Sequence, residues 1–333
     1  MSEKTKEVLV LTAAEINELM PMGTCIGVMR QAFKSLAQND FHQPLRTVVR
    51  PPEASGSIVM MPTYRQREVP AFGLKAICVF PANAEKGMDA HQGAVMLFSG
   101  TTGELQAMMN ASAITAIRTA AVSAVATDVL AREDANELAI VGTGVQARAH
   151  LSALFCVRRF KRVRIAGKHI THTKRFVEEM SENVSVALEP VELIESAVRA
   201  ADVIVTATNA QDPVLRRDWV ASGAHINAIG TYSPQSREID STTMAAARIF
   251  VDRRESAENE AGDYLLALQD GAIDRNSIVG ELGEVLLGKV KGRTSRDEIT
   301  LFKSLGLAIE DLACAEFLFA AAKENRVGTI VDL

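Results

Sequence analysis

The sequence has no paired cysteines and no surplus of positive charge. Its four cysteines, Cys25, Cys78, Cys156 and Cys314, are scattered, with no CxxC pair and no histidine at ligand spacing. This pattern suggests neither a disulfide framework nor a zinc site, so we expect no metal. The formal net charge of -5 gives no overall attraction for nucleic acid, which would call for a basic patch. Small-molecule partners are therefore expected.

Long apolar runs and targeting signals are also missing. No segment approaches the ~20 consecutive apolar residues that a membrane span needs. Residues 1–9 begin with Glu and Lys, unlike a secretory signal. The chain has no internal repeat, and its 47% hydrophobic and 23% charged residues are typical of globular proteins. These absences predict a cytoplasmic protein without membrane contact, and the length of 333 residues favours two domains.

The first third of the chain changes from a helical to a strand pattern. Residues 12–38 carry apolar side chains at helical spacing, interrupted near Pro21, and Thr12 with Glu15 resembles a capping box. Two short helices are therefore expected. Short runs rich in Val, Ile and Phe follow and predict strands of a mixed or antiparallel sheet at residues 57–61, 71–80, 94–98 and 105–109. Residues 113–130 contain neither Gly nor Pro and predict a long linking helix.

Strands and helices then alternate along the chain. Predicted strands are 137–141, 162–166, 184–188, 203–206, 226–229 and 249–251, with helices at 146–155, 173–180 and 191–200. Such alternation predicts an α/β fold with a doubly wound parallel sheet of the Rossmann type. Residues 302–323 form a further apolar helical pattern, which we expect to return to the first domain. The prediction is a dinucleotide-binding domain at 122–301 and a smaller, discontinuous α+β domain for dimerisation and substrate binding at 1–121 plus 302–333.

A glycine-rich turn follows the first strand of the alternating region. The strand that ends at Val141 runs into Gly142-Thr143-Gly144-Val145-Gln146-Ala147, a G-x-G-x-x-A pattern in strand–turn–helix context. Gly142 permits the tight turn, Gly144 leaves room for a pyrophosphate, and Ala147 lets the helix lie close to the strand. The segment from Gly142 to Gln146 is therefore predicted to bind a nicotinamide dinucleotide. The alternative is a turn that merely needs small residues.

The second strand of this region has no acidic residue at its end. A carboxylate there usually binds the free ribose 2′-hydroxyl of NAD, whereas this strand ends in Ala166-Gly167-Lys168-His169. The positive charge favours NADP(H) over NAD(H), with Lys168 as the main phosphate contact and His169 beside it. Alternatively, Lys168 is a solvated turn lysine.

Several blocks occur together in a familiar order, and over nearly its full length the chain resembles the ornithine cyclodeaminase and mu-crystallin family. The blocks are Arg46-Thr47-Val48-Val49, Met61-Pro62, Leu74-Lys75, Ile114-Thr115-Ala116-Ile117-Arg118-Thr119-Ala120-Ala121, the glycine-rich turn, His225-Ile226-Asn227-Ala228-Ile229-Gly230, Glu281-Leu282-Gly283-Glu284 and Phe302-Lys303-Ser304-Leu305-Gly306. The resemblance implies a homodimer joined through the first domain, with a small amino or imino acid bound between the domains against the nicotinamide.

The resemblance also implies roles for individual residues. Arg46 and Arg118 match two arginines that bind the substrate α-carboxylate, and Lys75 matches the active-site lysine. Bidentate binding by arginine orients the substrate carbon, and a partly desolvated lysine can exchange the proton that imine reduction needs. Expected cofactor contacts outside the glycine-rich turn are Thr119, Thr206, Ala207, Thr208, Ile229, Gly230 and Ser304. Alternatively, the two arginines form structural salt bridges; His91 aids proton transfer or is structural.

One position departs from the ornithine-cyclising members of the family. They carry an aspartate two residues beyond the glycine that matches Gly230, where this chain has Tyr232, a poor base at neutral pH that could line the substrate site. The sequence therefore favours an NAD(P)H-dependent reductase of small cyclic imino acids, of the pyrroline- or piperideine-2-carboxylate type. An alanine dehydrogenase-like enzyme, an ornithine cyclodeaminase and a mu-crystallin-like NADPH-dependent binding protein remain the alternatives.

Overall fold

A computed structural model describes residues 7–67, 69–80, 82–83 and 87–333. The expectation for residues 1–9 falls largely outside this range. The chain divides into two compact units, residues 1–118 with 307–333, and residues 119–306. Each unit is described here by itself.

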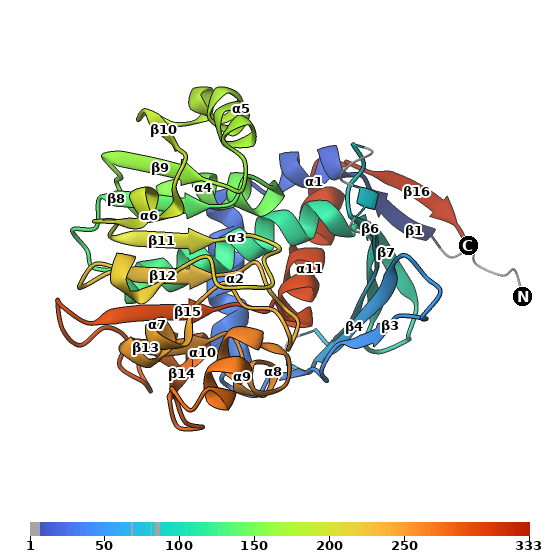
Figure 1. Cartoon of the computed structure of the whole chain (residues 1–333). Coiled ribbons are helices and arrows are strands. Elements are labelled where there is room, and N and C mark those ends of the chain that lie inside the picture. The colour runs from blue at the N-terminus through green and yellow to red at the C-terminus, as the bar shows by residue number, and fades with distance from the viewer. Residues whose placement is uncertain (1–6, 68, 81, 84–86) are drawn as a thin grey trace, which may run out of the picture. The chain divides into compact units, whose positions relative to one another are not determined.

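The first unit is built on a mixed eight-stranded sheet (Figure 1). Its strands are β1 (Glu7–Leu11), β2 (Phe41–His42), β3 (Thr47–Val49), β4 (Ser57–Arg65), β5 (Ala71–Val79), β6 (His91–Ser99), β7 (Leu105–Asn110) and β16 (Thr329–Asp332). They run in the order β16-β1-β7-β6-β5-β4-β2, and β3 also pairs with β4. Only the β1–β7 pair is parallel among these described pairings. The predicted strands are present, most of them longer than expected.

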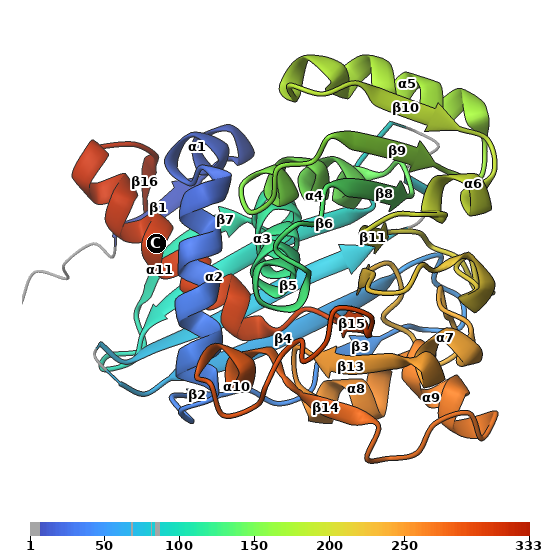
Figure 2. The ribbon, with the colours of Figure 1, turned by 90° about the vertical axis from the view of Figure 1, so that its left-hand side faces the viewer.

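Helices cover one face of this sheet. They are α1 (Ala13–Leu19), α2 (Met22–Leu36) and α11 (Ala308–Asn325), of which α11 packs against β4, β5, β6 and α2 (Figure 2). The expected capping box of α1 is present, because Glu15 N donates to Thr12 Oγ1 at 3.4 Å and Thr12 N donates to Glu15 Oε2 at 2.8 Å. The helical region is interrupted at Pro21, the residue that precedes α2.

The second unit contains a parallel sheet of eight strands, as the alternating pattern predicts. They are β8 (Glu137–Val141), β9 (Arg162–Ala166), β10 (Leu188–Val191), β11 (Val203–Thr206), β12 (His225–Ala228), β13 (Ala247–Val251), β14 (Ile278–Glu281) and β15 (Ile299–Lys303). The order is β10-β9-β8-β11-β12-β15-β13-β14. Its helices are α4 (Val145–Phe155), α5 (Ile170–Met180), α6 (Ile194–Val198), α7 (Ser241–Ala246), α8 (Arg254–Glu260), α9 (Gly262–Gln269) and α10 (Leu282–Leu286).

The order of strands places a topological switch point beside β8. From β8 the chain proceeds to β9 on one side, and later to β11 on the other. Dinucleotides bind outside the carboxyl ends of strands at such a point. The fold therefore puts the glycine-rich turn after β8 in the position expected for a cofactor site.

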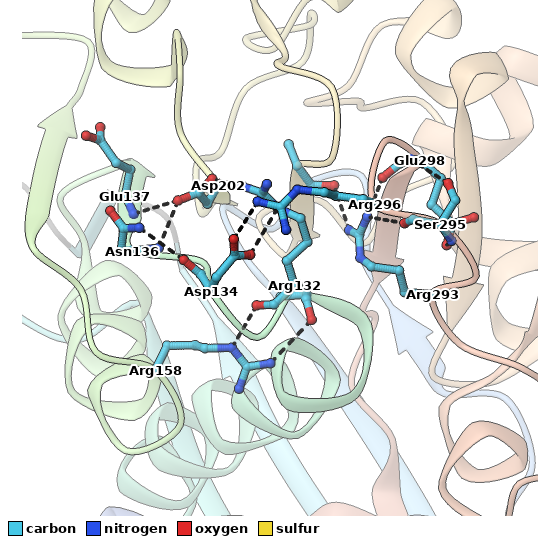
Figure 3. A network of polar contacts seen from close by, with 12 residues as sticks. Arg132, Asp134, Asn136, Glu137, Arg158, Asp202, Arg293, Ser295, Arg296 and Glu298 are labelled. Carbon is cyan, nitrogen blue, oxygen red and sulfur yellow. Dashed lines mark hydrogen bonds and ion pairs between the residues drawn. The ribbon is translucent and has the colours of Figure 1, made fainter.

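Helix α3 (Ala111–Leu130) is long and apolar enough to cross a membrane, and most of it is buried in the protein. The sequence expectation that no segment approaches this length was therefore wrong, and burial identifies α3 as a core helix. Its last carbonyl groups need donors, which cationic side chains supply favourably. Arg158 donates to Thr127 O and Asp128 O, and Arg293 donates to Leu130 O at 2.8 Å. Figure 3 shows both arginines within a larger polar network.

Two predicted elements near β10 were displaced. The strand expected at 184–188 is β10 (Leu188–Val191), and the helix expected at 191–200 is the shorter α6. Pro190 lies inside β10, which is tolerated because β10 is an edge strand and the missing N–H need not pair.

The predicted helix at 302–323 was wrong at its start. Phe302 and Lys303 end strand β15, which lies between β12 and β13 in the second unit. All five residues of β15 are buried, as expected for a central strand of a parallel sheet that is covered on both faces. The helix begins only at Ala308, and the chain passes to the first unit at Leu307 rather than at residue 302.

Candidate functional site

The glycine-rich turn joins β8 to α4 with the geometry that its sequence predicts. Gly142 has a φ of +126°, and a Cβ added to it would lie 2.4 Å from Ala207 O. At Gly144, the residue before α4, an added Cβ would meet no atom within 4 Å. The N-terminus of α4, 11 residues long, thus faces open space with N–H donors that suit a phosphate group. These features fit the pyrophosphate of a dinucleotide.

The strand ladder brings several predicted cofactor contacts to one edge of the sheet. Ala207 N donates to Val141 O at 2.8 Å, Ile229 N to Thr206 O at 2.9 Å, and Ser304 N to Ala228 O at 3.2 Å. Residues that follow β8, β11, β12 and β15 therefore lie in neighbouring positions at the carboxyl ends of these strands. The expected contacts Thr206, Ala207, Thr208, Ile229, Gly230 and Ser304 all belong to this edge.

The Ser304 hydroxyl is a buried polar group for which the described residues supply no hydrogen-bond partner. The residue is only 2% exposed. Such an atom in a native structure needs an explanation, for which a bound water, ion or ligand atom is one candidate. In a Rossmann fold the nicotinamide half lies over strands on the far side of the switch point from the adenosine ribose, so this hydroxyl suits a polar group of the nicotinamide.

Glu238 joins the ends of β11 and β12 by hydrogen bonds. The sequence did not predict this residue. Its carboxylate accepts hydrogen bonds from Thr206 Oγ1 at 2.9 Å, and at 2.7 Å from Thr208 N, Thr208 Oγ1 and Gly230 N. Burial raises the pKa of Glu238, but Lys303 and the bonds from Thr208 oppose this shift, and four donors favour the ionised form. The carboxylate therefore holds this part of the edge rigid.

A second buried acid, Asp263, neutralises Lys303 beneath the loop after β12. Lys303 Nζ lies 2.8 Å from Asp263 Oδ2 and donates to Thr231 O at 2.7 Å. Asp263 also accepts the N–H of Glu238 at 2.7 Å. Tyr232 follows in the same loop and is 40% exposed. Its phenol replaces the family aspartate at the surface of this loop.

Lys168 and His169 lie where the sequence placed them, directly after β9. Both are exposed, and β9 is the neighbour of β8. Gly167 is close to the glycine-rich turn, since an added Cβ would lie 3.2 Å from Thr143 Cγ2. His169 and His172 form an edge-to-face pair with ring centroids 5.4 Å apart. The positive charge is therefore available to solvent at the side of the turn where an adenosine ribose would bind.

In the first unit, the predicted residues Lys75 and Arg118 share one buried cluster of charges with two carboxylates. Lys75, in β5, has its Nζ 2.8 Å from Asp311 Oδ2. Arg118, in α3, has Nη1 2.5 Å from Glu310 Oε2 and Nε 3.3 Å from Asp311 Oδ1. Arg118 is thus a salt-bridge residue in this unit. Because a guanidinium carries five N–H donors, these contacts are compatible with a further one to a substrate carboxylate.

Burial and the neighbouring charges shift the pKa values of Lys75 and Arg118 in opposite directions. Burial and Arg118 lower the pKa of Lys75 to about 8, while Asp311 and Glu310 act in the opposite direction. Burial alone would lower the pKa of Arg118, but Glu310 and Asp311 reverse this and raise it. Arg118 therefore stays charged, whereas Lys75 can exchange a proton near neutral pH.

Glu310 and Asp311 were not predicted, although a signal was present. They interrupt an apolar helical pattern between Ile309 and Leu312, and all four residues are buried. Two adjacent acids on the buried side of a helix are unusual unless each is paired. They lie in the first turn of α11, where the helix dipole favours negative charge.

His91 and Arg46 occupy different surroundings in the same unit. His91 begins β6, and its N–H donates to Asp89 Oδ1 at 2.9 Å. Burial lowers the pKa of His91; the Asp89 charge opposes this shift, and the charges of Lys75 and Arg118 add to it. The net shift is downward, so the ring is neutral at neutral pH. Arg46 is half-buried just before β3. Its function as the second carboxylate-binding arginine stays a prediction.

The fold and the glycine-rich turn define the class as a dinucleotide-binding α/β protein with an additional discontinuous unit. The model of the ornithine cyclodeaminase/mu-crystallin family matches residues 6–326, and the chain belongs to this family. The resemblance inferred from the sequence is thereby confirmed.

Three similar proteins carry functional names. The mouse ketimine reductase mu-crystallin is 38% identical over 277 residues, 83% of this chain and 84% of that protein. The structure of Thermococcus litoralis Δ1-pyrroline-2-carboxylate reductase in complex with NADH and L-proline has a TM-score of 0.93, with 36% identity, covering 97% of this chain and 100% of that one. The structure of an archaeal alanine dehydrogenase dimer with bound NAD has a TM-score of 0.92 and 31% identity, covering 98% and 99%.

Replacing Ser304 tests the cofactor edge of the sheet. We expect Ser304→Ala to weaken NADPH binding about three- to tenfold, because one hydrogen bond to a buried group is lost. Binding of 2′-phospho-ADP-ribose, which has no nicotinamide, should not change. Both dissociation constants can be measured by titration calorimetry.

A matched control is Thr243→Val, since the Thr243 hydroxyl is also buried but lies in α7, beside the Asp240 carboxylate. It should bind both ligands as the unchanged protein does. Equal weakening of both ligands by Ser304→Ala would contradict the assignment.

Proposed function

We propose that this protein is an NAD(P)H-dependent reductase of small cyclic imino acids, which transfers hydride to the C=N carbon next to a carboxylate. The observation that carries the proposal is a buried lysine in a cluster with Arg118 and two carboxylates, its Nζ 2.8 Å from Asp311 Oδ2. The names of the mouse and Thermococcus relatives support the same reaction class.

The chemistry requires one hydride and one proton. The reduced dinucleotide supplies the hydride when bound. The cyclic imine, NAD(P)H and a proton give the cyclic amino acid and NAD(P)⁺. Arg118, with Arg46, binds the substrate carboxylate and so fixes the adjacent carbon. Lys75 supplies the proton to the imine nitrogen, which makes the carbon a better hydride acceptor.

Tyr232 favours this simple reaction over cyclodeamination. Cyclodeamination adds loss of ammonia and further proton transfers to the redox steps, and Tyr232 leaves these steps without the carboxylate that the ornithine-cyclising members carry at this position. An amino-acid dehydrogenase is the nearest alternative, because an alanine dehydrogenase shares the fold. A binding protein without turnover is an alternative of another class.

A substrate panel tests the proposal directly. Purified protein is incubated with NADPH or NADH and with pyrroline-2-carboxylate, piperideine-2-carboxylate, or pyruvate plus ammonia, while nicotinamide absorbance is followed. Ornithine is tested with catalytic amounts of NAD(P)⁺ by product analysis. We expect the fastest turnover with a cyclic imine. Tight NADPH binding without turnover of any compound would identify a binding protein instead.

Removing the lysine tests its role as proton donor. We expect Lys75→Met to lower kcat for imine reduction by about 10²- to 10⁴-fold, the usual contribution of a general acid. The dissociation constant for NADPH should change little, because Lys75 and the glycine-rich turn belong to different units.

The double variant Lys75→Met/Asp311→Asn is the control for an uncompensated carboxylate, because it removes the partner charge as well. It should be as inactive as the single variant and equally able to bind NADPH. A Lys75→Met variant with unchanged kcat would contradict the role of Lys75 as the proton donor.

We propose further that the enzyme prefers NADP(H). No acid directly follows β9, and the exposed Lys168 supplies positive charge there, with His169 beside it. The related structures with NADH and NAD make the opposite preference the outcome to be tested.

Lys168→Ala should lower kcat/KM for NADPH about tenfold or more, since a hydrogen bond to a charged group is worth about 1.5–3 kcal/mol. The value for NADH should remain. Lys174→Ala, an exposed change in the same region, is the control and should alter neither. A clear NADH preference of the unchanged enzyme would overturn the assignment.

We also propose that the enzyme is a homodimer joined through the face of the first unit's sheet that is opposite α11. This face exposes the apolar side chains of Val49, Ile58 and Phe72. A cavity of about 320 Å³ lies on it and is lined by His42, Pro44, Pro62, Thr63, Tyr64, Phe72, Gly73, Leu74 and Phe98. A contiguous apolar surface of this kind marks an association site, and a related structure is described as a dimer.

A charge placed on this face should prevent association. We expect Phe72→Glu to convert the dimer into a monomer, which sedimentation or light scattering would detect. Leu193→Glu is the control, because Leu193 is more exposed, at 63% against 47%, but belongs to the second unit. A monomeric unchanged protein would refute the dimer.

A further inference from the structure

The charged cluster of the first unit depends on two adjacent acids with different partners. Glu310 bonds Arg118 through Oε2, and its Oε1 accepts the N–H of Leu307 at 2.9 Å, at the start of α11. Asp311 instead lies between the two cations, with Oδ2 near Lys75 Nζ and Oδ1 near Arg118 Nε. Glu310 therefore anchors the arginine and the helix start, whereas Asp311 is the only carboxylate among the described residues within ion-pair distance of Lys75.

Stability alone gives little reason for this arrangement. The side chains of Lys75, Arg118, Glu310 and Asp311 are between 0% and 5% exposed. Burying each charge costs several kcal/mol, and well-packed apolar residues often replace buried ion pairs without loss. The cluster also leaves an ionisable lysine where a neutral side chain would pack. Its value lies in the chemistry of the lysine.

We propose that Asp311 is a positioning residue that holds the Lys75 ammonium in place and protonated for transfer to the imine nitrogen. This inference rests on the proposed reductase function. In the step, an N–H bond of the Lys75 ammonium breaks and an N–H bond to the imine forms. Lys75 becomes neutral and the substrate becomes an iminium cation, which accepts hydride from the reduced dinucleotide. Asp311 stays ionised throughout, and Lys75 then regains a proton from solvent.

The charges around Lys75 decide the direction of the effect. Arg118 on α3 opposes protonation, and Glu310 and Asp311 on α11 favour it. His91 on β6 interacts with Lys75 but is neutral at neutral pH, and Cys314, whose thiol pKa is raised, interacts with Asp311. Without Asp311, burial and Arg118 would dominate. The pKa of Lys75 would then fall, and its ammonium would be lost at lower pH.

The pH profile of kcat/KM tests this sign, because it reports the essential acid of the free enzyme. The unchanged enzyme should lose imine reduction as pH rises through about 8, where Lys75 deprotonates. In Asp311→Asn this decline should move to lower pH by about one to three units, the usual effect of a close opposite charge. Activity should recover on acidification. Titration of the substrate is common to both enzymes and cancels in the comparison.

Two variants separate this role from a structural one. Glu316→Gln removes another carboxylate of α11, the partner of Arg65 at 2.8 Å, and should leave the profile in place. Asp311→Glu keeps the charge but changes its distance from Lys75, and it should retain a decline near that of the unchanged enzyme with a lower kcat. If Asp311→Asn does not fold, Asp311→Glu decides: an unchanged kcat would overturn the proposal.

The outcomes also distinguish this inference from the proposed function. If the unchanged enzyme reduces no cyclic imine, the proposed function fails first. If it does so, and Asp311→Asn lowers activity equally at every pH, Asp311 is only structural and the inference is overturned. A shifted decline supports it.

Discussion

A buried positive charge needs a negative partner, and this requirement explains the path of the chain. Lys75 and Arg118 come from β5 and α3 and are almost fully buried. Their carboxylate partners arrive only after the whole second unit has been built, when α11 returns to the first. The helix carries both acids in its first turn, where its dipole favours them. The discontinuous unit thus brings the two carboxylates to the two buried cations.

The second unit solves a different problem, the rigid placement of backbone around a large ligand. Four strands end side by side, and each end is bonded to its neighbour through main-chain N–H and C=O groups. Glycine at 142 and at 230 permits contacts that any Cβ would prevent, since an added Cβ would lie 2.4 and 2.0 Å from neighbouring carbonyl oxygens. Glu238 and the Lys303–Asp263 pair fix the remaining freedom. The ends of these strands are therefore held in place by buried charged groups as well as by apolar packing.

Features set by neighbouring residues were accessible from the sequence, and those set by distant contacts were not. The turn at Gly142, the capping box at Thr12 and most strands follow from local patterns, as their observed bounds confirm. Lys75 was identified through family resemblance, because nothing near it in sequence marks a functional lysine. Asp311 and Glu238 could not be identified from the sequence, because their partners Lys75 and Thr206 lie far from them along the chain.

Errors in the secondary structure have the same origin. Pro190 argues against a strand unless that strand is known to be at an edge, and the residues of β15 suggest a helix unless their central place between β12 and β13 is known. Sheet order is a non-local property. The edge position of β10 and the central position of β15 thus explain why these residues form strands despite their local sequence.

Strand β5 presents different chemistry on its two faces because its side chains alternate between them. Lys75 points to the buried side, while its neighbours Leu74 and Ala76 lie on the opposite, less buried side. A shift of one residue in pairing would exchange every side chain between the two faces. It would place the Lys75 ammonium group on the apolar, less buried face and a leucine among the acids of α11. An inserted or deleted residue within this strand would therefore disturb the exposed apolar face and the buried charged cluster in a single event.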